Sequence, residues 1–317
     1  MDSRCSLCPR ACNVSRDISK GFCAQTNEIR LSRAALHFYE EPPISGTAGS
    51  GAIFFSGCNL KCVFCQNESI ANGNFGQVVS TERLARIMLN LQDQNANNIN
   101  LVTPSHFVPQ IREAIIIAKE NGLNIPIVYN SSAYELPETL KLLDGLVDVY
   151  LPDFKYYDSS MAFRFSNAKD YPEIAKAAIE EMYRQVKTPV FDDSRSGISN
   201  PGAVYSSNSH LIKKGVIVRH LLLPLGVKNA ENVISYLHET YGEKIYISVM
   251  NQYTPMTDTP TMLKVKDLYP ELFRKVTKRE YKRLTDFVLS LNVKNAFIQD
   301  GDTASDSFIP NFDLTGV

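Results

Sequence analysis

The stretch AIFFSGCNLKCVFCQN, residues 52–67, decides how we interpret this sequence. Residues 52–55 are apolar and predict a short β-strand. The strand leads through a serine and a glycine into a loop with three cysteines: Cys58, Cys62 and Cys65. Sites in parallel α/β folds are built at the carboxyl ends of strands. Three thiolates on such a loop can bind one face of a four-iron cluster and leave one iron open, and open metal positions mark reactive sites.

The other cysteines form a second group near the start of the sequence. All seven lie before residue 66, and the first four are Cys5, Cys8, Cys12 and Cys23. An odd number of cysteines argues against a complete disulfide framework. Four thiolates can close the shell of a structural zinc or of a second, fully ligated iron–sulfur cluster, and metal-free thiols are the alternative. The segment has little core of its own, so a metal would supply its folding energy.

Composition limits the classes of function. The chain has 317 residues, of which 44% are apolar and 21% charged, and its net charge is −1. Without a basic excess, composition gives no argument for binding nucleic acid or a membrane surface. No apolar run reaches the length of a membrane span, and the first residues lack the apolar core of a signal peptide. We therefore expect a cytoplasmic protein, in which cysteines serve as metal ligands more often than as disulfides.

Apolar strands alternate with helical patterns from residue 51 onward. The pattern predicts strands at 52–55, 99–103, 127–130, 147–151, 216–223, 245–250 and 296–299. It predicts helices around 84–91 and at 110–121, 138–143, 172–187, 231–241 and 278–291. This alternation indicates an α/β fold with parallel strands, and about six βα units suit a partial (β/α)6 barrel. We expect a Cys-rich extension at 1–50, the barrel at 51–317, and a long polar loop or insertion at 188–214.

The cysteine loop resembles the cluster loop of the radical S-adenosylmethionine (SAM) superfamily. Further similarity, in the first cysteine group, in Pro152-Asp153-Phe154-Lys155 and in the ending Ile309-Pro310-Asn311-Phe312-Asp313, is to homologues of pyruvate formate-lyase activating enzymes. The resemblance implies a [4Fe-4S] cluster on Cys58, Cys62 and Cys65, with SAM chelating the open iron and Phe64 packing near its adenine. A zinc loop or a chance cluster of cysteines is the alternative.

The resemblance also implies a reaction. Reductive cleavage of SAM would yield a 5′-deoxyadenosyl radical that abstracts hydrogen from a substrate. An activating-enzyme-like chain would form a glycyl radical on a partner protein or peptide, with electrons from a donor such as flavodoxin or ferredoxin. Two alternatives stay open: a radical SAM enzyme that acts on a small molecule, and a metal-binding or electron-transfer protein that forms no radical.

Polar residues at other strand ends are candidates for the SAM pocket. The family's glycine-rich GGE-like motif, which holds the SAM amino group, is absent from the end of the second strand. The backbone near Thr103 and the hydroxyl of Ser105 are acceptors that suit an ammonium. His106 is a candidate acid or base, or else a histidine that points to solvent. Asn130, Ser131 and Ser132 suit ribose hydroxyls, or else form a turn or cap.

Three charged residues complete the candidates. Asp153 and Lys155 alternate at a strand end, so both are expected in the barrel mouth, where the resemblance places them near SAM or the substrate backbone. A surface ion pair is the alternative. Arg219 lies within an apolar strand and needs an anionic partner, either the SAM carboxylate or a structural Glu or Asp.

Overall fold

Seven parallel strands form the centre of the chain. A computed structural model describes residues 4–192, 210–299 and 309–317. The parallel strands are β2 (Ser50–Phe55), β4 (Ile99–Val102), β5 (Ile127–Ser131), β6 (Val149–Pro152), β8 (Ile212–Leu221), β9 (Tyr246–Met250) and β10 (Ala296–Ile298). They neighbour one another in chain order, from β2 at one side to β10 at the other. The strands form an open sheet with six crossovers, which confirms the predicted α/β fold and agrees with a partial barrel.

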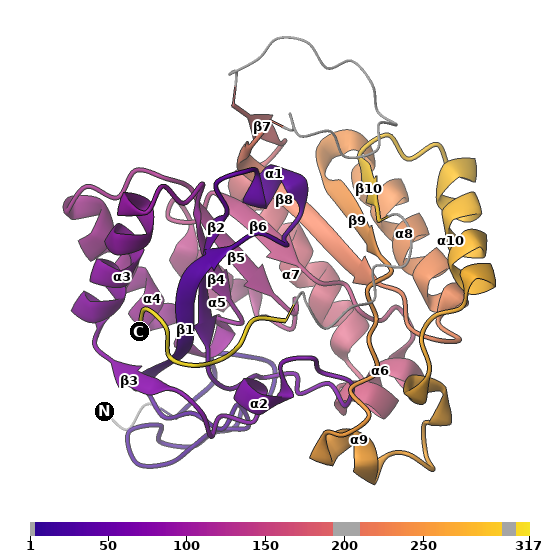
Figure 1. Cartoon of the computed structure of the whole chain (residues 1–317), viewed down its shortest axis with the longest axis horizontal. Coiled ribbons are helices and arrows are strands. Elements are labelled where there is room, and N and C mark those ends of the chain that lie inside the picture. Colours follow the sequence, from indigo (N-terminus) through magenta and orange to yellow (C-terminus); the bar gives the residue numbers. More distant parts are fainter. Residues whose placement is uncertain (1–3, 193–209, 300–308) are drawn as a thin grey trace.

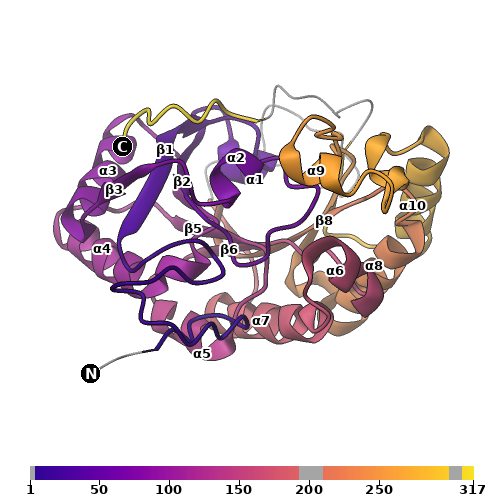
Figure 2. The same cartoon turned by 90° about the horizontal axis from the view of Figure 1, so that it is seen from below.

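Long helices and the short helix α5 lie along the outer side of this curved sheet (Figure 2). They are α3 (Thr81–Asp93), α4 (Val108–Glu120), α5 (Pro137–Leu140), α7 (Tyr171–Val186), α8 (Val227–Tyr241) and α10 (Lys278–Ser290). At the carboxyl ends of the parallel strands lie α2 (Glu68–Ala71), α6 (Ser159–Ser166) and α9 (Pro260–Lys264), together with the N-terminal segment (Figure 1). Short 3₁₀ turns follow at η1 (Ser105–Phe107), η2 (Lys141–Leu143), η3 (Gly242–Lys244) and η4 (Pro270–Phe273). The carboxyl edge of the sheet is thus where residues far apart in sequence meet.

Helix α3 shows why the sequence patterns hold. The Ser80 side chain accepts a hydrogen bond from the backbone of Arg83 and caps the first turn. One stripe of the helix is buried against the sheet: Leu84, Ile87, Met88 and Leu91. Full burial of one such side chain contributes about 1.5–3 kcal/mol, so the stripe fixes which face of α3 meets the sheet.

The sheet extends beyond β2 in a way that the sequence pattern does not predict. Strand β1 (Ile29–His37) pairs antiparallel with β2, and β3 (Gln77–Val79) pairs antiparallel with β1. Charged residues interrupt the apolar alternation of β1, which hides it from a periodicity argument. Residues 29–37 of the predicted extension therefore belong to the same sheet as the barrel strands.

Two further segments bear on the sheet edges. The C-terminal residues run along β1, where Leu314 N donates to Ser32 O at 3.1 Å and Ala34 N donates to Thr315 O at 2.8 Å. Strand β7 (Val190–Phe191) pairs with the start of β8, and the turn α1 (Pro42–Ser45) follows β1.

Most of the predicted polar loop at 188–214 lies outside the described residues. Within the described residues, no helix is both long and apolar enough to span a membrane.

Candidate active site at the carboxyl edge of the sheet

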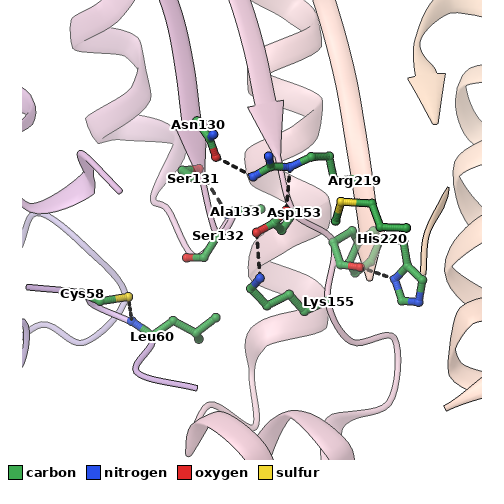
Figure 3. A network of polar contacts seen from close by, with 12 residues as sticks. Cys58, Leu60, Asn130, Ser131, Ser132, Ala133, Asp153, Lys155, Arg219 and His220 are labelled. Carbon is green, nitrogen blue, oxygen red and sulfur yellow. Dashed lines mark hydrogen bonds and ion pairs between the residues drawn. The ribbon is translucent and has the colours of Figure 1, made fainter. Parts of the chain in front are cut away.

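The cysteine loop begins directly after β2. Gly57 adopts a left-handed backbone conformation, with φ of +85°, and turns the chain out of the strand. Its N–H donates to Ile70 O at 2.8 Å, and Cys65 N donates to Cys62 O at 3.1 Å. Leu60 N donates to the Cys58 sulfur at 3.4 Å (Figure 3). These bonds fold the loop on itself at the carboxyl edge of the sheet, as the sequence predicts.

The three thiols of the loop share one partly buried region. Burial raises the pKa of Cys58, and the neighbouring Cys62 raises it further. Burial also raises the pKa of Cys65, with Cys58 and Cys62 adding to the effect, while the positive charge of Lys155 opposes it. Thiolates crowded in this way need a positively charged centre as their partner.

The donor set of the loop consists of three cysteine thiols on one short segment. In the part of the chain that the structure describes, no three Cys, His, Asp or Glu side chains are placed to hold one metal ion. Iron–sulfur clusters are bound by cysteine thiolates, so the residue types of the loop fit the implied cluster.

Phe64 anchors the loop to the core. Its ring is 6% exposed and packs edge-on against Tyr156, Phe165 and Tyr253, with centroids 6.1–6.4 Å apart. Such pairs add about 0.5–1.5 kcal/mol beyond area burial. The ring is thus fixed among three aromatic residues next to the cysteines, and contact with an adenine stays a prediction.

A network of charged and polar side chains joins β5, β6 and β8 near the cysteine loop (Figure 3). Arg219 on β8 donates from Nε to Asp153 at 2.9 Å, from Nη1 to Glu40 at 3.1 Å and from Nη2 to Asn130 at 2.5 Å. Lys155 Nζ lies 2.7 Å from the other carboxylate oxygen of Asp153. Their side chains are only 10–18% exposed. The predicted pair Asp153 and Lys155 is therefore an interior ion pair and not a surface one.

Burial and the neighbouring opposite charges together determine the pKa values in this network. Burial disfavours the charged form of Asp153, but Arg219 and Lys155 outweigh burial and lower its pKa. Burial likewise opposes the charge of Lys155, yet Asp153 keeps its pKa raised. The pKa of Glu40 is raised because burial outweighs the attraction of Arg219. Arg219 already has structural carboxylate partners, which is one of the two alternatives stated for it, and its contact with SAM stays a prediction.

His106 is buried and neutral. It is 2% exposed, and its Nε2 lies 2.7 Å from Ser56 O, one residue before Gly57. Burial, together with the nearby cations Arg16 and Lys61, lowers its pKa to about 3, although the hydrogen bond to Ser56 O opposes the shift. The ring therefore does not point to solvent, and its visible contact is a hydrogen bond to the residue that precedes the cysteine loop.

The predicted amino-group and ribose contacts are largely engaged with other protein groups. Thr103, with φ of +59°, donates its N–H to Asn130 O, and Ser105 Oγ donates to Glu135 at 2.5 Å. Ser131 Oγ accepts from Ala133 N at 3.2 Å (Figure 3). The Asn130 side chain is bound to Arg219 and Glu40. These residues line the strand ends as expected, while their direct contacts with SAM stay predictions.

The four N-terminal cysteines come together as a group. A Cβ on Gly21 would lie 3.5 Å from the Cys12 sulfur and 3.6 Å from the Cys23 sulfur. Phe22 N donates to the Cys12 sulfur at 3.1 Å. Burial raises the pKa of Cys8 to about 12, with Glu135, Cys23 and Cys12 adding to it, and Cys5 likewise raises that of Cys23. The predicted metal at this group stays a prediction.

Several residues of the site were not predicted. Glu40, the anionic partner of Arg219, lies 179 residues away in sequence, so no local pattern links the two. Glu135 is a buried carboxyl beside Ser105 and Ser131 that nothing in its flanking sequence marks. Ser132, by contrast, belongs to the predicted polar run at 130–132, and its buried hydroxyl has no partner among the described residues.

Comparisons with known proteins agree with the site. Residues 52–192 match the family described as the radical SAM superfamily. The chain is 29% identical over 303 residues to the uncharacterized protein MJ0674 of Methanocaldococcus jannaschii, covering 91% of this chain and 75% of that protein. It is 23% identical over 201 residues to MJ0808 of the same organism, covering 58% and 56%. Among solved structures, Streptococcus suis SuiB bound to precursor peptide SuiA gives a TM-score of 0.48 at 15% identity, covering 77% of this chain but 46% of SuiB.

The matched segment contains the functional features described above. It includes β2, the cysteine loop, β4, β5 and β6 with their polar ends. Asp153 and Lys155 lie within it, and Arg219 of the following strand β8 joins their network. The match to the radical SAM superfamily model thus covers the part of the chain that contains the cysteine loop and the ion pair of Asp153 and Lys155.

Proposed function

We propose that this chain is a radical SAM enzyme whose [4Fe-4S] cluster is held by Cys58, Cys62 and Cys65. The observation that supports this most is the cysteine loop at the carboxyl end of β2, inside the segment that matches the superfamily. When bound, the cluster and SAM supply one-electron cleavage of a sulfonium and hydrogen abstraction from a substrate. An external donor such as flavodoxin or ferredoxin provides the electron.

The chain's own residues bind and orient the cofactors. Lys155, held by Asp153 and close to the thiols, places a positive charge where the negative charge of the cluster and of a SAM carboxylate would lie. Ser132 offers a free hydroxyl at the end of β5, which suits a ribose hydroxyl better than the engaged Asn130 or Ser131. We assign the remaining SAM contacts to Thr103, Ser105 and Phe64. His106 supports the loop through Ser56 O.

We infer an activating-enzyme-like substrate, a glycine residue in a partner protein or peptide, in a cytoplasmic setting. The resemblance of residues 152–155 and of the C-terminal segment supports this inference. A small-molecule substrate is the rival within the same chemistry, and a protein that binds metal without turnover is the rival outside it. The group Cys5, Cys8, Cys12 and Cys23 would hold structural zinc or a second cluster.

The experiment is a measurement of 5′-deoxyadenosine. The protein is reconstituted anaerobically with iron and sulfide, reduced with dithionite and given SAM. We expect product that depends on Cys62, so Cys62→Ala abolishes it while metal at the N-terminal group remains. Zinc on residues 58–65 in place of a reducible cluster would overturn the proposal, as would unchanged SAM cleavage by Cys62→Ala.

The substrate class needs a second comparison. Formation of 5′-deoxyadenosine that rises with a glycine-containing peptide supports the hypothesis of an activating-enzyme-like substrate. Product formation that responds to a metabolite and not to the peptide favours the small-molecule rival. A reducible cluster that never cleaves SAM under either condition favours the non-catalytic rival.

A further inference from the structure

Arg10 joins the N-terminal cysteine segment to the cysteine loop of the barrel. Its Nε donates to Asn59 O at 2.9 Å and its Nη2 to Leu60 O at 3.3 Å. These carbonyls belong to the two residues that directly follow Cys58. The same guanidinium donates to Ser166 O at 2.8 Å and Asn167 O at 2.6 Å, at the end of α6. One side chain thus satisfies carbonyls from two segments that have no regular pairing with each other.

Two aromatic rings hold the guanidinium in this position. The Cζ atom of Arg10 lies 4.0 Å from the ring centre of Phe22 and 5.0 Å from that of Tyr134. Phe22 comes from the N-terminal segment, and Tyr134 from the turn after β5, where its carbonyl accepts a 2.7 Å bond from the Asn59 amide. Stacking of this kind contributes about 0.5–2 kcal/mol and suits a planar guanidinium.

The end of α6 is a fixed base for the loop. Asn167 closes the helix in a left-handed conformation, and the last carbonyls of a helix lack partners within it. Val63 N in the loop donates to Phe165 O at 2.8 Å, next to the two carbonyls that Arg10 binds. The loop is therefore bound to α6 directly through Val63 and indirectly through Arg10, at opposite ends of the stretch between Cys58 and Cys65.

We propose that Arg10 is a positioning residue for the iron–sulfur cluster, fixing the backbone after Cys58 against the end of α6. This inference rests on the proposed function, because it assumes that Cys58, Cys62 and Cys65 hold the cluster. Arg10 itself lies between Cys8 and Cys12. The conformation of the N-terminal segment therefore determines where this side chain holds the backbone of the loop. Groups that orient metal ligands from outside typically change metal affinity by about 10–100-fold when removed.

The test compares Arg10→Lys and Arg10→Ala with a matched control. Lysine keeps the charge but cannot donate to four carbonyls from one plane, so both variants should lose iron faster. Lys20→Gln removes an exposed charge from the same segment and serves as the control. We measure the rate at which a chelator removes the iron that depends on Cys62. About tenfold faster release is expected for both Arg10 variants and an unchanged rate for Lys20→Gln.

A spectroscopic measurement separates positioning from general destabilisation. The electron paramagnetic resonance spectrum of the reduced cluster should change in Arg10→Lys and stay unchanged in Lys20→Gln. Guanidinium at low millimolar concentration should restore slow iron release in Arg10→Ala, whereas ethylammonium should not. Wild-type release and a wild-type spectrum in Arg10→Lys would overturn the inference. Absence of any Cys62-dependent iron in the wild type would instead overturn the proposed function.

Discussion

Gly57, at the turn from β2 into the cysteine loop, gives the sharpest test of local geometry. A methyl group at this position would clash with Cys23 O and lie 2.7 Å from Cγ of Gln25, in the N-terminal segment. Gly122 also has a positive φ, of +99°, but a methyl group there meets nothing within 4 Å. Gly57→Ala should therefore lower the free energy of unfolding by about 1 kcal/mol or more beyond Gly122→Ala, measured by urea denaturation.

The comparison also bears on the site. Because the clash is with the N-terminal segment, Gly57→Ala should release iron from the cysteine loop faster than Gly122→Ala does. Equal stability of the two variants would mean that the segment does not pack against Gly57 as described.

Glu135 makes folding stability depend on pH. Burial raises its pKa from 4.5 to about 7, despite hydrogen bonds with Ser105, Ser131 and Tyr129. The unfolded chain loses this proton at lower pH than the folded chain, so stability falls as pH rises from about 4.5 to 7. The full effect is about 3 kcal/mol. Glu135→Gln keeps the side chain neutral and should remove this part of the pH dependence.

The pH dependence of the unfolding free energy has to be compared between wild type and Glu135→Gln, because buried histidines change the stability with pH in the opposite direction. Burial lowers the pKa of His106 to about 3, so its contribution is lost as pH falls below the ordinary histidine value. Denaturation of wild type and Glu135→Gln at several pH values isolates the glutamate. The exposed Glu138→Gln is the control and should retain the wild-type slope. An identical slope in Glu135→Gln would contradict a neutral buried Glu135.

At the scale of elements, α10 shows how local signals define a helix. The Thr277 side chain accepts from Glu280 N, and the Glu280 carboxylate accepts from Thr277 N, forming a capping box. Thr277→Ala should cost about 1 kcal/mol of unfolding free energy. Thr285→Ala, within the same helix, is the control and should cost less, because alanine favours a helix interior. A smaller loss for Thr277→Ala than for Thr285→Ala, in denaturant unfolding, would refute the cap.

Element prediction succeeded where packing and local pattern agree. The parallel strands are buried on both faces, so they are apolar runs of the kind that β4 and β6 show, and their positions follow from the sequence. Strand β1 was missed because its charged side chains break the alternation. Helix α6 was missed as well, although Asp158 caps it, because the segment is only eight residues long.

The sequence indicated where the candidate residues lie in the fold, but not which protein groups they contact. The loop cysteines, Asp153 and Lys155 could be placed because strand ends share one edge of the sheet. That Arg219 meets Glu40 could not be predicted, because the contact depends on how the turn after β1 enters the barrel. The role of Arg10 could not be predicted either, because its partners lie in the cysteine loop and at the end of α6, and only the folded chain brings these two segments together.

For the whole molecule, the C-terminal segment covers an edge of the sheet. Strand β3 pairs with the first residues of β1, and Leu314 and Thr315 bond to the next ones. Removing residues 312–317 deletes these two hydrogen bonds and the contact of Phe312 with Phe54, whose ring centres are 5.4 Å apart. We expect a loss of about 2 kcal/mol in unfolding free energy and self-association through the open edge.

Sedimentation velocity checks the association. A chain with Asp313→Asn keeps the segment and loses only an exposed ion pair with Arg33, so it should remain like the wild type. A truncated chain that stays as stable and as dispersed as the wild type would show that the segment does not protect the sheet.

The chain-order arrangement of the sheet also has a consequence for synthesis on the ribosome. Each parallel strand finds its neighbour already made, so the sheet can grow from β2 toward β10 as translation proceeds. The N-terminal segment completes its contacts later, because Arg10 binds residues 49 and 50 positions later and also residues 156 and 157 positions later. At about 5–20 residues per second, roughly 10–30 s pass before its complete binding surface exists. During that interval the thiols emerge without their final surroundings, so assembly of the proposed cluster on the nascent chain should lag well behind synthesis of the cysteines themselves.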